Sequence, residues 1–285
     1  MRSVGARLPA SLRGTWGATA VLVLALCAVL ATVPSSSAAF TARVVNTTST
    51  VATNRYFTCQ AAMVGDAAYY AYPLDDPTPT NGSAARDLSG SNRAGTYQNS
   101  AAHSAVSACT RDGGGSTTFD GSSDFVTTPN ALNNQTFTLE TWFRTSTSSG
   151  ALMGFSNSLL ALVPTSWDRM VYFTTGGRLT FGVYPSSYQT ITSTNGYADG
   201  NWHHMMATLG PAGMFLYVDG VQVASSTNTA AQSYSGYLRI GYNYLSGWPG
   251  VVGTNYYFNG QLGHAAYYTS QLSASSAAIH YASGR

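Results

Sequence analysis

Glu140 is the residue whose type and setting come nearest to those of a catalytic group. It is the only glutamate among the 285 residues and lies in the alternating segment 136–143. Glycosidic-bond hydrolysis typically uses two carboxylates about 5–9.5 Å apart. The same strand face instead carries Trp142 and Arg144. We therefore expect Glu140 to form an ion pair with Arg144, packed beside Trp142, and we expect the protein not to be an enzyme.

His203 and His204 invite a metal-binding interpretation. Adjacent residues on a strand point to opposite faces, so the pair cannot chelate one ion. We expect one of them to be a hydrogen-bonded core histidine and the other a packed surface residue. No Gly-x-Ser-x-Gly sequence occurs, so a nucleophilic serine has no motif to support it.

The elements that must position these residues are strands. Segment 199–220 predicts two strands, 203–209 and 214–218, and Asp219-Gly220 suits a type I′ turn into a third. Similar alternation elsewhere predicts about a dozen strands, and residues 272–283 predict a short helix. We predict an all-β fold, a jelly-roll sandwich of two antiparallel sheets with a short C-terminal helix.

The first 39 residues are typical of an export signal. Arginines at positions 2, 7 and 13 precede the apolar segment 18–33, and small residues follow at 35–39. We expect cleavage after Ala39 and a secreted protein; an uncleaved membrane anchor is the alternative, although a spanning helix needs about 20 apolar residues. Residues 40–64 are expected to form an extended N-terminal segment, and residues 65–285 the domain, with no membrane span in the mature chain.

The charge balance argues against nucleic acid as a partner. All eleven acids lie after residue 39 but only ten of the thirteen arginines do, so the mature chain is near −1. A basic stripe is the usual electrostatic mark of a nucleic-acid binder. Charged residues make up 8% of the chain, lysine is absent and tyrosine occurs nineteen times. This composition fits a secreted bacterial β-protein encoded by a GC-rich genome.

Two cysteines remain after removal of the signal segment. In an exported chain, Cys59 and Cys109 are expected to form a disulfide. A loop of this size contributes roughly 4 kcal/mol of stability in the chain-entropy model. The alternative is a metal-binding or catalytic thiol, but the sequence has no Cys-x-x-Cys spacing to support it.

Several short motifs occur in the same order as in a known family. The clearest is Asp-Gly-x-Trp-His-His at 199–204, followed by Leu-Tyr-Val-Asp-Gly at 216–220. Segments 87–90, 119–126, 137–142 and 257–262 agree in order as well. Over about residues 65–283 the chain resembles the laminin-G-like (concanavalin A-like lectin/glucanase) jelly-roll domains. The resemblance implies the sandwich fold, while the family is too broad to identify the ligand.

The resemblance also raises the question of calcium. Similar domains often bind Ca²⁺ near loop acids, and Asp87 and Asn92 offer oxygen ligands. The alternative, which we favour, is an Asx-turn in which Asp87 bonds its own backbone. Gly263-His264 stands where family members commonly carry an acid, and this departure weakens a metal site there. The sequence thus leaves Ca²⁺ possible and requires no cofactor.

Aromatic residues in loops are the candidate ligand-binding residues. They lie in or beside segments bounded by proline and glycine, namely Trp167, Tyr184, Tyr188, Tyr244 and Trp248. Exposed rings of this kind stack on sugars, which favours a secreted, non-catalytic, lectin-like module that binds polysaccharide or cell-surface glycan. The alternatives are a structural or adhesive surface domain, in which these rings cover the sandwich ends, and a glycoside hydrolase.

Overall fold

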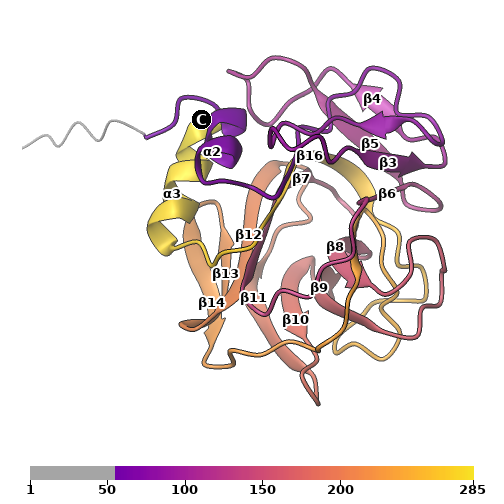
Figure 1. Ribbon diagram of the computed structural model, residues 1–285, viewed down its shortest axis with the longest axis vertical. Helices are drawn as coiled ribbons and strands as arrows, with labels where there is room; N and C mark the ends of the chain where they lie inside the picture. The colour runs from indigo at the N-terminus through magenta and orange to yellow at the C-terminus, as the bar shows by residue number, and fades with distance from the viewer. Residues whose placement is uncertain (1–54) are drawn as a thin grey trace, which may run out of the picture. The chain divides into compact units, whose positions relative to one another are not determined.

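The computed structural model describes residues 55–285, which form a sandwich of two antiparallel sheets (Figure 1). Sheet A contains, in spatial order, β14 (Val221–Ser226), β13 (Gly213–Val218), β12 (Trp202–Gly210), β7 (Phe137–Arg144), β16 (Asn259–Tyr268), β5 (Ser116–Asp120) and β4 (Ala102–Ser104), with β1 (Tyr70–Tyr72) also paired to β16. Sheet B contains β11 (Gln189–Gly196), β10 (Arg178–Val183), β9 (Trp167–Thr174), β8 (Ala151–Ser156), β15 (Tyr237–Ile240), β6 (Phe125–Thr127), β3 (Gly95–Gln98) and β2 (Ala84–Ala85). The predicted all-β jelly-roll sandwich is confirmed. The expected signal peptide, residues 1–39, and residues 40–54 lie outside the described residues.

The centre of sheet A consists of the strands that alternation predicted most clearly. β12 pairs with β13 from Met205↔Val218 to Gly210↔Gly213. Asp219 and Gly220 have φ angles of 53° and 77°, as a type I′ hairpin turn requires. On β7 the inward-facing side chains, Phe137, Leu139 and Phe143, belong to the core between the sheets.

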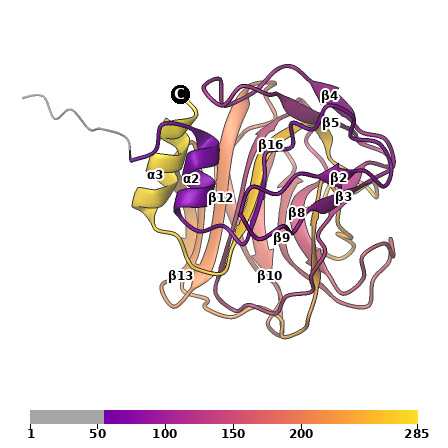
Figure 2. The same cartoon turned by 45° about the horizontal axis from the view of Figure 1, so that its top comes forward.

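Two helices cover the outer face of sheet A. Figures 1 and 2 show α2 (Cys59–Gly65) and α3 (Ala274–Ser283) side by side next to β12 and β13. Ala277 of α3 packs on Met206 and Tyr217. Both faces of the centre of this sheet are therefore buried, and side chains of β12 and β13 that point away from the core, such as Met206 and Tyr217, lie beneath α3. Neither described helix is long and apolar enough to cross a membrane.

The structure corrects the expected extended segment at 40–64, because its last residues are helical. The Thr58 hydroxyl caps α2 by accepting from the Ala61 amide at 3.1 Å. The Asp112 carboxylate accepts from the Cys59 and Gln60 amides at 2.9 and 3.3 Å. Part of this capping comes from a residue some fifty positions away, which local sequence patterns do not reveal. The predicted C-terminal helix is confirmed, with Ser273 as its N-cap.

The outer face of sheet B is covered in part by a loop. Loop 243–256 lies over β9, where Thr174 forms a bridge with Val251 and the Tyr172 hydroxyl donates to the Pro249 carbonyl at 2.7 Å. Outward-facing Met170 and Tyr172 form a small apolar cluster with Leu245 and Trp248 of this loop. The more exposed part of the sheet, on β11, borders the candidate site.

Candidate functional site

Four of the five predicted aromatic residues line one pocket on the outer side of sheet B. Trp167 opens β9, Tyr184 and Tyr188 lie between β10 and β11, and Trp248 comes from the covering loop. Their cavity measures about 220 Å³, and its polar lining consists of Thr165, Ser166 and Gln232. The strand ends and the loop thus bring together rings that are up to 81 residues apart in the sequence.

The rings differ in how far they are exposed. Tyr188 is 40% exposed, and its ring lies edge-on to Tyr184 at 4.8 Å and to Trp248 at 5.1 Å between centroids. Burial and the neighbouring Tyr184 raise the pKa of the Tyr188 hydroxyl. Trp248 is only 4% exposed, so the expectation of an exposed ring at this position is wrong. The fifth predicted residue, Tyr244, packs edge-on against Trp167 at 4.9 Å and does not line the pocket.

The position of Trp248 depends on Gly182. A β-carbon at Gly182 would lie 2.4 Å from Cζ3 of the indole ring, so only glycine leaves room for the ring on the sheet. Trp248 consequently fills the space above β10 with its ring and presents only an edge to the pocket. The loop aromatics therefore form a packed cluster, as the alternative interpretation predicted, and also a pocket wall.

A buried ion pair, which the sequence analysis did not single out, holds the pocket backbone. Asp168 and Arg169 lie at a β-bulge, and Arg169 has a φ of 56°. The Asp168 carboxylate accepts from the Tyr184 amide at 2.7 Å and from the Gln232 amide at 2.6 Å. Arg169 donates to the Gln232 carbonyl at 3.1 Å. The sequence did carry a signal, an acid and a base inside a strand whose other residues are mostly apolar.

Burial raises the pKa of Asp168 even though Arg169 lies beside it. The aspartate is fully buried, and its two backbone donors come from the two segments that carry pocket residues. Its carboxylate is therefore engaged in shaping the pocket from behind. Asp168 and Arg169 thus hold the backbone behind the pocket, and neither of them lines it.

The structure corrects the expected partner of Glu140. Its carboxylate accepts from His204 at 2.7 Å, from His280 at 2.9 Å and from the Tyr268 hydroxyl at 2.5 Å. Arg144 instead donates its Nε to the Gly200 carbonyl at 2.7 Å. His280 belongs to α3, so the expected pairing failed because a helix from the distant C-terminal segment covers this face. Trp142 is buried, as predicted.

Electrostatic contacts favour the charged forms of Glu140 and His280 in this buried cluster. Burial raises the pKa of Glu140, but His280 and His204 more than offset this effect and hold the pKa below its usual range. For His280, burial lowers the pKa, but Glu140 and Asp66 raise it above the usual value. The Asp66 carboxylate reaches His280 Nε2 at 3.2 Å from the end of α2. The cluster joins sheet A to both helices.

The two adjacent histidines separate as strand geometry predicted. His204 is fully buried against Glu140 and Trp142, while His203 lies on the other side of β12. His203 contacts Asp219 at 2.7 Å and Asp199 at 3.1 Å. Both carboxylates raise the pKa of His203 against the opposing effect of burial. The two histidines therefore point to opposite faces of β12 and cannot coordinate one ion together.

The candidate calcium residues lie in a turn that satisfies the Asp87 carboxylate internally. It accepts from the amides of Ala71, Ser89 and Arg93 at 2.9–3.1 Å and from the Ser89 hydroxyl at 2.6 Å. These bonds lower the pKa of Asp87 despite its partial burial. Asn92 takes a φ of 54° in the same turn. This is the favoured Asx-turn arrangement, and a Ca²⁺ site at Asp87 and Asn92 stays a prediction.

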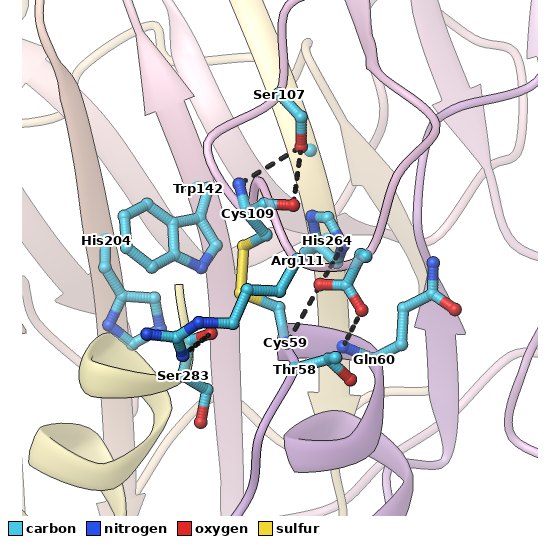
Figure 3. The surroundings of a disulfide bond; sticks show 12 residues. Thr58, Cys59, Gln60, Ser107, Cys109, Arg111, Trp142, His204, His264 and Ser283 are labelled. Carbon is cyan, nitrogen blue, oxygen red and sulfur yellow. Dashed lines mark hydrogen bonds and ion pairs between the residues drawn. A yellow bond between two sulfur atoms is a disulfide. The ribbon is translucent and has the colours of Figure 1, made fainter. Parts of the chain in front are cut away.

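The predicted disulfide joins Cys59 to Cys109 (Figure 3). It lies beside the Trp142 indole and ties the start of α2 to loop 107–112. Within residues 55–285, Asp112 completes with these cysteines the one cluster of three possible metal-ligating side chains. Both sulfur atoms are consumed in the disulfide, and Asp112 caps α2, so the cluster is structural.

Comparison with known proteins supports this architecture. The structure resembles domain 4 of the GH43 extracellular arabinanase AbnA from Geobacillus stearothermophilus, solved in complex with arabinotriose, with 16% identity and a TM-score of 0.52 over 75% of this chain and 98% of that one. It also resembles a botulinum neurotoxin type C structure, with 12% identity and a TM-score of 0.54 over 78% of this chain and 52% of that one. The binding domain of Paraclostridial Mosquitocidal Protein 1 is similar too, at 13% identity and a TM-score of 0.54 over 76% of this chain and 52% of that one.

No curated protein matches the sequence. At these identities the structural matches show the fold alone. A family model described as the concanavalin A-like lectin/glucanases superfamily matches residues 90–278, well over half of the chain. The matched range contains the aromatic pocket and, from the buried cluster, Glu140, His204 and Tyr268, whereas Asp66 and His280 lie just outside it. The chain therefore belongs to the concanavalin A-like lectin/glucanases superfamily.

Proposed function

We propose that the protein is a secreted, non-catalytic carbohydrate-binding module that holds a sugar ring in the pocket formed by Trp167, Tyr184, Tyr188 and Trp248. The observation that carries the proposal is the convergence of these four rings on one cavity of about 220 Å³. Sugar rings bury their C–H faces on aromatic side chains while hydroxyl and amide groups bond their oxygens. Thr165, Ser166 and Gln232 supply such groups at the rim.

The state of the carboxylates supports a non-catalytic role. Glu140 lies under α3 with three donors on its oxygens, and Asp168 is buried behind the pocket with two backbone donors. Hydrolysis needs an acid and a second carboxylate that reach the glycosidic bond. No carboxylate is among the residues that line the pocket.

Export is supported by the Cys59–Cys109 disulfide, because such bonds persist in oxidising compartments. A neighbour in the comparisons comes from an extracellular enzyme and was solved with an arabinose oligosaccharide. By analogy, we infer a glycan partner outside the cell.

A structural or adhesive domain is the second candidate, favoured by the burial of Trp248 to 4% exposure. The two candidates differ in whether the protein binds a sugar at all. In a glycan array with the secreted protein, the binding module retains specific sugars and the structural domain retains none. Repeating the array with a chelator tests separately whether binding depends on Ca²⁺.

Tyr188→Ala tests the pocket itself. Loss of one stacking ring costs about 1–3 kcal/mol, so affinity should fall about 5- to 150-fold at an unchanged melting temperature. Phe57→Ala is the matched control, because Phe57 is an exposed ring next to α2 and outside the pocket. Equal affinity of wild type and Tyr188→Ala for an array hit would refute the proposed pocket.

A further inference from the structure

A second hollow lies on the same face, at the other end of the strands that border the aromatic pocket. It measures about 270 Å³ and is lined by Thr174, Thr175, Arg178, Thr192, Pro249 and Gly250. Tyr184 follows the last residue of β10, while Arg178 is the first. At about 3.4 Å per residue, these ends are roughly 20 Å apart, which exceeds the length of a single sugar.

The same loop forms one wall of both hollows. Trp248 lines the aromatic pocket, and the next two residues, Pro249 and Gly250, line the second hollow. The Tyr172 hydroxyl fixes this wall by donating to the Pro249 carbonyl at 2.7 Å. Consecutive residues of one loop therefore line both hollows.

The surface between the hollows is rich in threonine hydroxyls. In the β10–β11 register, Thr180 lies opposite Thr192 and Gly182 lies opposite Thr190. The hydroxyls of Thr180 and Thr192 are 2.8 Å apart. Phe181 and Ile191, the alternate residues, point into the core. Thr180 is buried and Gly182 lies beneath the Trp248 ring, so the accessible polar strip between the two hollows consists of half-buried Thr190 and exposed Thr192 on β11.

Arg178 gives the second hollow a cationic character. It is exposed, and its Nε donates to the Thr175 carbonyl at 3.2 Å, which fixes the start of the guanidinium group. Among the described residues, no hydrogen bond or ion pair engages its two terminal nitrogens, and no carboxylate lines the hollow. By contrast, Arg86, another exposed arginine, is paired with Asp75 at 2.9 Å. A planar guanidinium fork suits a carboxylate.

We propose that the two hollows and the threonine strip form one extended site for an acidic polysaccharide, with a carboxylated sugar held by Arg178. The proposal rests on the proposed function, because it places a neutral part of the same chain in the aromatic pocket. Stacking supplies affinity at one end of the site, and charge supplies selectivity at the other. Uronic-acid polymers have the required chemistry, a carboxylate on a sugar ring at regular spacing.

The test uses uronic-acid oligosaccharides of increasing length, each paired with its methyl ester, which keeps the sugar and removes the charge. Wild-type protein should bind an acid long enough to span the site about tenfold more tightly than its ester, as expected for one charge-assisted contact. Arg178→Gln should reduce the affinity for the acid to that for the ester, and the advantage of the acid should shrink in high salt. Arg86→Gln is the matched control and should change neither affinity.

The outcomes separate the two proposals. Equal binding of acid and ester by wild type, or an Arg178→Gln variant that weakens both alike, overturns the extended acidic site and leaves the aromatic pocket in place. Tyr188→Ala should weaken acid and ester by the same factor. If wild type binds neither the oligosaccharides nor any sugar on the array, the proposed function fails together with this inference.

Discussion

The replacement Glu140→Gln tests whether the buried charge cluster holds the two helices on sheet A. Glutamine keeps the shape of the side chain but removes the charge that His204 and His280 contact at 2.7 and 2.9 Å. It also places an amide group where one oxygen accepts from Tyr268. Breaking a fully buried pair by changing one partner costs about 3–5 kcal/mol. For a domain of this size, each kcal/mol lowers the melting temperature by about 2–4 °C.

The pH profile gives a sharper readout than the melting temperature alone. The pKa of Glu140 is lowered in the folded state, so its contribution is complete above the ordinary value of 4.5 and is lost as the pH falls towards the folded pKa. The pKa of His280 is raised, so its contribution is complete below 6.5 and is lost as the pH rises through the folded pKa. Wild-type stability should therefore be greatest between about pH 4.5 and 6.5, and Glu140→Gln should flatten both limbs.

Urea unfolding from pH 3 to 9 measures both effects. Asp199→Asn is the matched control, since it changes another carboxylate–histidine pair, in which His203 lies on the neighbouring strand β12 and the acid, Asp199, is about half exposed. Exposed pairs contribute about 0–1 kcal/mol, so this variant should stay close to wild type. The reasoning is refuted if Glu140→Gln unfolds with the wild-type midpoint and the wild-type pH profile.

Three further predictions concern the disulfide, the covering loop and the first residue of the mature chain. Removing the disulfide by Cys59→Ala should cost about 4 kcal/mol, the chain-entropy value for a 50-residue separation, and peptide mapping without reductant should find the pair in wild type; free-thiol labelling of the folded protein would contradict it. Trp248→Ala should cost about 3–5 kcal/mol in a thermal melt because the ring is buried over Gly182, whereas Tyr188→Ala should leave the melt unchanged; similar melts for the two variants would contradict the packing described. The intact mass of the secreted product should correspond to a chain that begins near Phe40, and a mass that retains residues 1–39 would exclude the predicted cleavage.

The fold could be predicted because the strands and turns have local sequence patterns that indicate their geometry. In β12 and β13 the period-two pattern and the Asp219-Gly220 turn fix the pairing locally, without information from elsewhere in the chain. The same alternation of side chains along a strand predicted that His203 and His204 lie on opposite faces. The disulfide followed from the presence of two cysteines in an expected exported chain. Each of these inferences uses short-range information.

The parts that sequence analysis missed depend on long-range packing. Arg144 was the expected partner of Glu140 because the two share a strand face, whereas one of the actual partners, His280, lies 140 residues later on a helix that covers this face. Trp248 was expected to be exposed because it lies in a loop rich in glycine and proline, but that loop folds back on β9 and β10. Asp168 and Arg169 are an acid and a base inside an apolar strand, but the bulge through which they act and their distant backbone partners depend on tertiary contacts.

The two ends of the described chain meet, which opens a route to redesign. The Ser283 hydroxyl donates to the Tyr56 carbonyl at 3.2 Å, and Arg111 donates to the carbonyls of both Phe57 and Ser283. A short linker would therefore join residue 285 to residue 55, and new termini could be opened in an exposed loop on the pocket side. Such a circular permutant would keep every strand pairing and would place a fused reporter beside the aromatic pocket instead of beside the helices.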